Sequence, residues 1–220
     1  MPLDDASADL GVTDSALVDG SRRLRQSKLK RLVDILGSTG GLIFLGPFLL
    51  LVALLIFIDS RGPILFRQRR TGFDGRTFVI YKFRSMRVVE DGDDIQQARR
   101  DDCRTTKVGA FLRRTSIDEL PQLLNVLKGD MSLVGPRPHA VSHDQYYSTA
   151  IVEYRQRFLA RPGITGLAQI SGCRGETPNV EAMAVRIAHD LTYIREWSFS
   201  GDISILLKTM LIGPFDPAAY

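Results

Sequence analysis

A run of 24 residues without a single charge, from Ile35 to Ile58, constrains this chain more than any other feature. As a straight helix the run would extend about 36 Å, and the apolar core of a bilayer is roughly 30 Å thick, so its length predicts a membrane segment. Pro47 follows Gly46 at the middle of the run. Proline removes one helical hydrogen bond and crowds the preceding turn, so we expect a bend there.

Basic residues flank the apolar run on both sides. Those before it are Arg22, Arg23, Arg25, Lys28, Lys30 and Arg31, and those after it are Arg61, Arg67, Arg69 and Arg70. Positive flanks favour the cytoplasmic side of a membrane, so both ends are predicted to lie there. A helix bent at its centre would then enter one leaflet and return. A single crossing with a kink is the alternative, and these features alone do not decide between the two.

The chain divides into three parts around this segment. Residues 1–20 are small and acidic and are expected to form a disordered tail. Residues 21–61 hold the basic segment and the membrane helix, and residues 62–220 are expected to form one folded domain, since a chain of 220 residues has room for one modest core. The net charge of +4 is compatible with nucleic acid, anionic membrane or phosphorylated substrates. Basic residues gather around the apolar run without interleaved aromatics, which disfavours nucleic acid.

The expected fold class is α+β and mainly helical. Residues 62–86 predict a β-hairpin that turns at residues 72–75. Apolar residues at helical spacing predict a helix near 180–194 and a second one near 203–212, which we expect either in the core or in the membrane interface. The highly charged residues 90–106 are expected to form a mobile loop or a surface helix.

Asp118 and Glu119 are the first candidates for chemistry. Two adjacent carboxylates at a predicted helix start could divide the work: one attacks phosphorus and the other holds Mg²⁺. Arg113 and Arg114 lie just upstream, where they could hold phosphate oxygens. The alternative is structural, because Ser116-x-x-Glu119 also matches a helix capping box.

Further candidates lie on either side of this pair. Arg137 stands between two prolines, and a restrained guanidinium is suited to binding phosphate. Lys82 and Arg84, two residues apart on a predicted strand, are expected to share a face and form a basic patch for phosphate or lipid headgroups. His139 and His143 have a spacing that suits metal ligands, but no third ligand is apparent nearby.

The sequence resembles the bacterial sugar transferases known as monotopic phosphoglycosyl transferases. The likeness extends from Lys30 to Tyr220. It rests on DELPQLLNVLKGDMSLVGPRP at 118–138, FRQ at 66–68, YKFRSM at 81–86 and RPGITGLAQ at 161–169. The apolar segment corresponds to the re-entrant membrane helix of that family, kinked here at Pro47. The resemblance implies a small cytosolic catalytic domain with interfacial amphipathic helices.

The resemblance also implies residue roles. Asp118 corresponds to the nucleophile that becomes phosphoglycosylated, Glu119 to the carboxylate that binds Mg²⁺ (with Mn²⁺ as a substitute), and Arg137 to the arginine that contacts the nucleotide-sugar phosphates. Lys82, Arg84 and Arg114 are expected to assist in binding substrate. UMP would leave first, and a polyprenyl phosphate would then enter the vacated space.

PHAVSH at 138–143, RGET at 174–177 and HDLTYIREWS at 189–198 resemble the colanic-acid and xanthan branch, which transfers glucose-1-phosphate to undecaprenyl phosphate. UDP-galactose and N-acetylated UDP-sugars are the alternatives, since Leu167 and Cys173 stand where tryptophan is common. Members of this branch usually carry a large N-terminal region that is absent here. Another alternative is a non-catalytic membrane scaffold for polysaccharide assembly.

The resemblance further implies a location and partners. We expect the cytoplasmic face of the bacterial inner membrane, with both termini cytoplasmic, and a role in the first membrane step of exopolysaccharide synthesis. The expected partners are a UDP-sugar, undecaprenyl phosphate and inner-membrane lipid, with a homodimer left open and no nucleic acid. Gly46 is a departure, because the family often has serine before the membrane proline.

Overall fold

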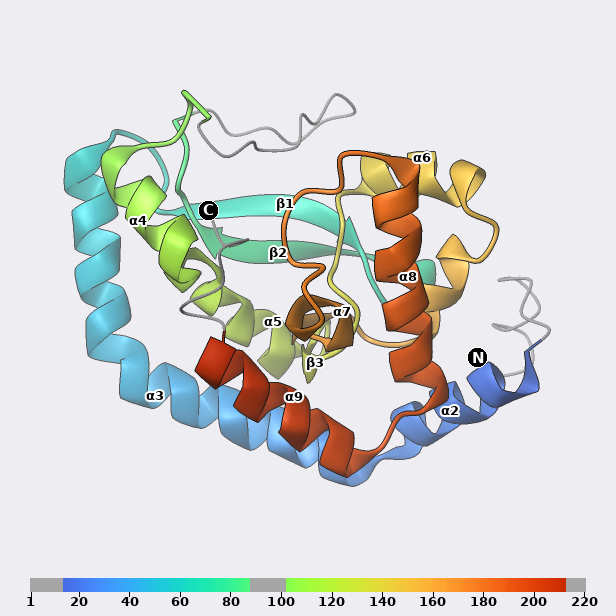
Figure 1. The fold of residues 1–220 in the computed structure, drawn as a ribbon. Coiled ribbons are helices and arrows are strands. Elements are labelled where there is room, and N and C mark those ends of the chain that lie inside the picture. The colour runs from blue at the N-terminus through green and yellow to red at the C-terminus, as the bar shows by residue number, and fades with distance from the viewer. Residues whose placement is uncertain (1–13, 88–101, 213–220) are drawn as a thin grey trace.

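The computed structural model describes residues 14–87 and 102–212 of the chain (Figure 1). The fold is mainly helical and contains a small amount of β-structure, as predicted. A long helix, α3 (Lys28–Asp59), runs along one side, and the start of helix α9 (Phe199–Ile212) meets the start of α3 through the ion pair between Lys30 and Asp202. The other helices are α2 (Ser15–Gln26), α4 (Lys107–Thr115), α5 (Leu123–Lys128), α6 (Val141–Ala150), α7 (Leu167–Ile170) and α8 (Val180–Arg195), joined by the short 3-10 helices η1 (Phe73–Gly75), η2 (Ile117–Gln122) and η3 (Tyr154–Leu159).

The predicted hairpin is confirmed. Strands β1 (Leu65–Thr71) and β2 (Thr77–Phe83) pair antiparallel, in a register that sets Leu65 opposite Phe83 and Thr71 opposite Thr77. The turn passes through η1, where Gly75 has a φ of +72°, a conformation that glycine adopts without strain. Side chains alternate between the two faces along each strand, and directly paired residues share a face, so the partners Gln68 and Ile80 face the interior together and both are buried.

A second small sheet was not predicted from the sequence. Strand β3 (Ser132–Val134) pairs in parallel with β4 (Gly163–Thr165), which brings together two of the stretches that carry the family resemblance, 132–138 and 161–166. The two backbones approach so closely that a Cβ at Gly163 would lie 2.1 Å from the nitrogen of Gly135. Glycine at both positions therefore fixes where the loop carrying Arg137 leaves the sheet.

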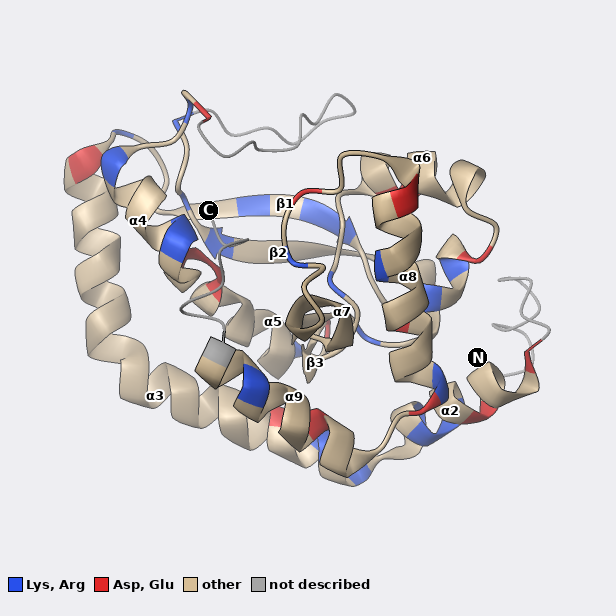
Figure 2. Cartoon of the chain, in the orientation of Figure 1, with Lys and Arg blue, Asp and Glu red and all other residues tan. Residues whose placement is uncertain are grey.

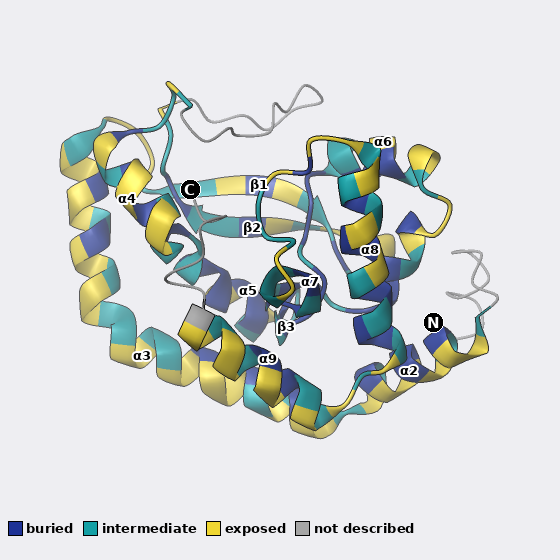
Figure 3. Cartoon of the chain, viewed as in Figure 1, coloured by how far each residue is buried: buried dark blue, intermediate teal, exposed yellow. Residues whose placement is uncertain are grey.

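Helix α3 is long and apolar enough to cross a membrane. Pro47 lies inside it, and the helix is bent in Figure 1 as the proline predicts. Most of its length carries no charged side chain (Figure 2), and most of it is exposed to the surroundings (Figure 3). The large exposed apolar residues of α3 are Leu29, Leu32, Ile35, Leu36, Ile43, Phe44, Phe48, Leu50, Leu51, Leu54, Leu55, Phe57 and Ile58. Helix α9 adds exposed Ile203, Leu207, Met210 and Leu211.

The expectation of a disordered tail over residues 1–20 is wrong for its last part. Helix α2 begins at Ser15, capped by the side chain of Asp14, which accepts hydrogen bonds from the backbone of Ala16 and Leu17. Leu17 is fully buried, and a Cβ at Gly20 would lie 2.0 Å from the carbonyl oxygen of Ile194 on α8. The small and acidic composition of residues 1–20 does not predict this packing, because it depends on contacts with α8. Residues 1–13 lie outside the described part of the chain, as does most of the predicted 90–106 loop.

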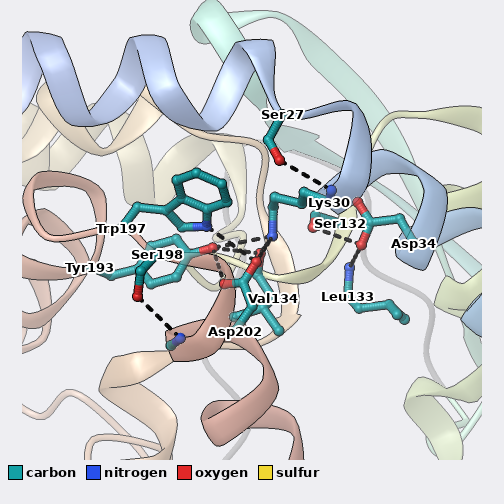
Figure 4. A network of polar contacts seen from close by, with 11 residues as sticks. Ser27, Lys30, Asp34, Ser132, Leu133, Val134, Tyr193, Trp197, Ser198 and Asp202 are labelled. Atoms are coloured by element: carbon teal, nitrogen blue, oxygen red, sulfur yellow. Dashed lines mark hydrogen bonds and ion pairs between the residues drawn. The ribbon is translucent and has the colours of Figure 1, made fainter.

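A buried polar network joins the start of α3 to the rest of the fold (Figure 4). The ammonium group of Lys30 donates to the carbonyl of Val134 (2.9 Å), the hydroxyl of Tyr193 (3.2 Å) and the carboxylate of Asp202 on α9 (2.7 Å). One turn later, Asp34 accepts from the hydroxyl of Ser132 and from the backbone of Leu133. These contacts fix the direction in which α3 leaves the domain.

Candidate active site

The two predicted catalytic carboxylates lie on η2, between α4 and α5. Ser116 ends α4 with a φ of +56°, which turns the chain so that Asp118 and Glu119 face strand β2. The capping-box alternative is not formed: the hydroxyl of Ser116 accepts from Arg174, and the side chain of Glu119 binds two cations. The local sequence therefore serves to present the pair and not to cap a helix.

Glu119 lies at the centre of this site. Lys82 donates to its Oε1 at 2.8 Å, and Arg137 donates to both carboxylate oxygens, with 3.1 Å between Nη1 and Oε2. The fork of Arg137 is thus bidentate, which fixes the plane of the carboxylate. Three segments far apart in the sequence, 77–83, 117–122 and 135–138, meet at one carboxylate.

The two neighbouring carboxyl groups have opposite electrostatic environments. Burial alone would raise the pKa of Glu119, but the charges and hydrogen bonds of Arg137 and Lys82 outweigh it and lower that pKa well below its usual range. Burial, and then the negative charge of Glu119, raise the pKa of Asp118 to about 6. Burial also lowers the pKa of Lys82, although Glu119 opposes the shift.

Asp118 has the environment expected of a nucleophile. It is 9% exposed, so it is shielded from bulk water yet reachable. Within the described residues no hydrogen bond to its side chain is present, whereas its neighbour Glu119 accepts hydrogen bonds from Lys82 and Arg137. A carboxylate that is desolvated and not held by hydrogen bonds is more nucleophilic than one that is solvated and held.

The carboxylates fit a magnesium ion. Mg²⁺ in phosphate-binding sites takes one or two protein carboxylates, with the other positions filled by phosphate oxygens and water. Oε2 of Glu119 accepts one hydrogen bond and so retains a lone pair, and the carboxylate of Asp118 is adjacent. No group of three or more potential side-chain ligands occurs among residues 14–87 and 102–212, so substrate oxygens would have to complete the coordination.

A buried arginine holds the loop that carries Arg137. Arg157, on η3, donates to the backbone carbonyl of Arg137 and binds Asp190 of α8 at 2.8 Å. The same guanidinium donates to Nδ1 of His139 at 2.7 Å. Burial and the charge of Arg157 lower the pKa of His139 well below its usual range, so its imidazole is neutral. His139 thus belongs to a structural network, and its spacing to His143 does not indicate a metal site.

Two further arginines lie close enough to act on this site. Arg70 of β1 donates to the carbonyl of Pro138, and Arg186 of α8 donates to the carbonyl of Gly175. Burial, and then the positive charge of Arg137, lower the pKa of each to about 10. The cations outnumber the carboxylates that face them, as expected for a site that receives a polyanionic substrate.

The structure brings together some of the predicted site residues and separates others. Lys82, Asp118, Glu119 and Arg137 meet. Arg84 does not: it lies beyond the end of β2, is buried, and donates to the carbonyl and hydroxyl of Ser60 at the end of α3. The prediction that Arg84 shares a face with Lys82 assumed that the strand continues, but β2 ends at Phe83.

Arg114 is exposed on α4. Its neighbour Arg113 is the one whose charge acts on Asp118. Local spacing does not distinguish these adjacent residues, since only the rotation of α4 decides which side chain faces the pair.

Sequence reasoning missed Arg70, Arg157, Arg186 and Asp190. Arg157 and Asp190 are 33 residues apart, and no spacing rule connects them. By sequence position, Arg70 belongs with the basic residues that flank the membrane segment. The only available signal was their position inside or beside the stretches that resemble a known family.

Comparison with known proteins identifies the family. The profile of the bacterial sugar transferase family matches residues 25–214. A UDP-glucose:undecaprenyl-phosphate glucose-1-phosphate transferase of Caulobacter vibrioides is 55% identical over 181 residues, covering 82% of this chain and 68% of that protein. A protein of the same name from Escherichia coli is 51% identical over 192 residues, covering 87% of this chain and 41% of that protein.

A more distant relative, a UDP-N-acetylgalactosamine-undecaprenyl-phosphate N-acetylgalactosaminephosphotransferase of Aeromonas hydrophila, is 41% identical over 182 residues, 83% of this chain and 43% of that protein. The chain therefore spans about two thirds of the Caulobacter relative and about two fifths of the other two. Since the family profile covers almost all of the sequence, the chain belongs to the bacterial sugar transferase family.

Proposed function

We propose that this protein transfers glucose-1-phosphate from UDP-glucose to undecaprenyl phosphate and releases UMP. One observation carries the proposal: Asp118, with a pKa raised to about 6, lies buried beside Glu119, which is fixed by Lys82 and Arg137. This arrangement provides a nucleophile and a bound set of cations in one place. The Caulobacter and E. coli relatives carry the name of this reaction.

The first half-reaction uses Asp118 as the nucleophile. One oxygen of its carboxylate forms a bond to the β-phosphorus of the UDP-sugar while the bond from that phosphorus to the UMP oxygen breaks. The product is a sugar-phosphoryl aspartate. Lys82 and Arg137 stabilise the negative charge that accumulates on the phosphate oxygens.

The second half-reaction returns the enzyme to its starting state. After UMP departs, an oxygen of undecaprenyl phosphate attacks the same phosphorus, and the Asp118 carboxylate is regained. A Mg²⁺ ion held by Glu119 would neutralise diphosphate charge. Mn²⁺ is the expected substitute.

The choice of glucose rests on the relatives' names and on one contact. Arg174 donates to Ser116, two residues before the nucleophile, which sets the stretch 174–177 beside the carboxylate pair. That stretch resembles the glucose-transferring branch. UDP-galactose is the second expectation and an N-acetylated sugar the third, since the Aeromonas relative is the more distant one.

A UMP-release assay tests the function. Purified protein is incubated with undecaprenyl phosphate, Mg²⁺ and, in parallel, UDP-glucose, UDP-galactose and two N-acetylated UDP-sugars. We expect the highest kcat/KM for UDP-glucose. A strong preference for an N-acetylated sugar would refute the sugar assignment, and no release from any donor by a folded, membrane-bound protein would favour a scaffold.

We also propose that α3 is re-entrant and places the domain on the cytoplasmic face of the inner membrane. Support comes from its exposed apolar surface, the bend at Pro47 and the basic flanks. Single cysteines at Arg22 and Arg61, both exposed, test it in a Cys103→Ser/Cys173→Ser background. Both should react with a membrane-impermeant thiol reagent from the cytoplasmic side of oriented vesicles. Labelling from opposite sides would mean a simple crossing.

A further inference from the structure

A basic cleft opens where α2 meets α3, away from the catalytic pair. It measures about 270 Å³ and its wall includes Arg25, Lys28, Lys30, Arg31, Arg161 and, as the acidic member of that lining, Asp34. The cleft reaches the C-terminal end of α5, because Arg31 donates to the carbonyls of Val126 and Leu127 there. Asp118 and Glu119 precede the N-terminal end of α5. The two sites therefore lie at opposite ends of this helix.

Two of the five cations are neutralised by nearby carboxylates. Lys30 binds Asp202 at 2.7 Å, and Arg25 binds Asp74 at 2.7 Å. Among residues 14–87 and 102–212, the remaining three, Lys28, Arg31 and Arg161, form no ion pair with a carboxylate. Arg31 binds carbonyl oxygens, and Nε of Arg161 donates to the carbonyl of Gly129 at 3.1 Å. Carbonyl groups satisfy hydrogen bonds but carry no formal charge, so an excess of positive charge persists in the cleft.

Asp34 offsets only part of this excess, because one carboxylate faces three cations that have no carboxylate partner. Its charge opposes the lowering of the Arg161 pKa but acts less strongly than that of Arg31. Its Oδ1 accepts from the hydroxyl of Ser132 at 3.0 Å and from the backbone of Leu133 at 2.9 Å, which binds it to β3 (Figure 4). Burial, and then the charge of Arg31, lower the pKa of Arg161, as expected when two guanidinium groups share a partly desolvated space. An anion in the cleft would relieve this repulsion.

The start of α3 adds to the positive potential. Ser27, Lys28, Lys30 and Arg31 all line the cleft, so the first turn of a 32-residue helix borders it. That turn has no acidic side chain, although helices usually carry acidic residues at this end. Backbone N–H groups at a helix start bind phosphate well.

The position of the cleft indicates where the anion comes from. Exposed Leu29, Leu32 and Leu36 follow within the next turns of α3, so its apolar surface begins at the edge of the cleft. If that surface enters hydrocarbon, the cleft lies at the depth of lipid headgroups. We propose that the cleft binds the phosphate group of an anionic phospholipid, at a site separate from the catalytic pair.

Competitive lipid retention tests the proposal on the full-length chain. The protein is purified in detergent with equal amounts of phosphatidylglycerol and phosphatidylcholine, and the retained lipid is identified by native mass spectrometry. We expect the wild type to retain one phosphatidylglycerol in preference to phosphatidylcholine. Arg161→Gln should weaken this retention about tenfold, since one charge-assisted contact to phosphate is lost.

Lys208→Gln is the matched control, because Lys208 is an exposed cation on helix α9 but outside the cleft. It should retain phosphatidylglycerol as the wild type does, and an equal loss in both variants would refute a specific site. Lys28→Gln gives a second test with little risk to folding, since Lys28 is exposed, and it should also weaken retention. Unchanged retention in both cleft variants would refute the proposal.

A second arm separates a lipid headgroup from free phosphate. Inorganic phosphate and glycerol 3-phosphate are added to the lipid-free protein and thermal stability is followed. We expect stabilisation only at concentrations far above those at which phosphatidylglycerol acts, because the acyl chains add apolar contact. Equal potency of the soluble phosphates would overturn the lipid assignment. UMP release in detergent should be unchanged in Lys28→Gln, which distinguishes this site from the catalytic one.

Discussion

Two lysine–carboxylate pairs in this protein look alike by distance but differ in what surrounds them. Lys30 and Asp202 are 2.7 Å apart, and Lys82 and Glu119 are 2.8 Å apart, each with side chains mostly buried. In the first pair the partners are complete: Lys30 donates three hydrogen bonds, and Asp202 also accepts from Tyr193 and Trp197. A buried network whose members are all hydrogen-bonded stabilises the fold.

The second pair is part of a larger and unbalanced set. Arg137 shares Glu119 with Lys82, and Asp118 lies beside them with its pKa raised to about 6. Glu119 is fixed by cations and Asp118 is not, so the pKa of Glu119 is lowered whereas that of Asp118 is raised. The comparison teaches that the geometry of a buried ion pair does not by itself make a site reactive. Reactivity depends on an additional group beside the pair that is incompletely paired.

The largest expected effect on turnover comes from a substitution at the catalytic region. Asp118→Asn removes the proposed nucleophile, and turnover should fall by at least about 10⁴-fold. Asp19→Asn is the matched control, because its carboxylate is 69% exposed on α2. UMP release at a wild-type rate by Asp118→Asn would show that the aspartate is not the nucleophile.

Glu119→Gln should have the next largest effect. The substitution weakens the binding of Lys82 and Arg137 and removes the proposed metal ligand, so we expect a loss of about 10²- to 10³-fold in kcat. EDTA should stop the wild-type reaction, and Mg²⁺ or Mn²⁺ should restore it. Full activity of the wild type in EDTA would exclude the metal role.

The pH dependence provides a smaller, quantitative test. Only deprotonated Asp118 attacks, and burial raises its pKa to about 6, so kcat/KM should fall about tenfold per pH unit below pH 6. Lys82 lowers the pKa of Asp118, and its removal in Lys82→Met should move the inflection to higher pH. An inflection near pH 4 in the wild type would mean that Asp118 titrates as an ordinary solvated carboxyl group.

The smallest effect on turnover is expected at the structural pair. Lys30→Met leaves Asp202 buried without its cation and should lower the free energy of unfolding by about 3–5 kcal/mol. Lys30→Met/Asp202→Leu should recover much of that loss. At a temperature where both variants are folded, UMP release in detergent should stay within about twofold of the wild type, as for residues remote from the chemistry. A selective loss of kcat in a fully folded variant would contradict the division between the two regions.

Periodicity and composition predicted those parts of the fold that depend on nearby residues. The apolar helix with its central proline, the hairpin at 62–86, and the helix over 180–194 all follow from local spacing, and the structure contains each of them. Contacts between distant residues were beyond this reasoning. The parallel pairing of β3 and β4 depends on two glycines 28 residues apart, Gly135 and Gly163, that let two backbones touch.

The candidate site divides in the same way. The adjacent carboxylates and the arginine between two prolines were recognisable because their local sequence is unusual. Arg84 was misplaced because its strand ends one residue earlier, and Arg157 was missed because it acts through the backbone carbonyl of Arg137. A side chain that only positions another leaves no local pattern in a single sequence.

The most direct test of the account is the intermediate itself. Purified wild-type protein is incubated with UDP-glucose and Mg²⁺ but without lipid phosphate, and intact mass and peptide mapping are then recorded. The account predicts one hexose-phosphate adduct on Asp118, formed together with one equivalent of UMP, and lost when undecaprenyl phosphate is added. UMP release that strictly requires the lipid acceptor, with no adduct on a fully active enzyme, would contradict the covalent mechanism.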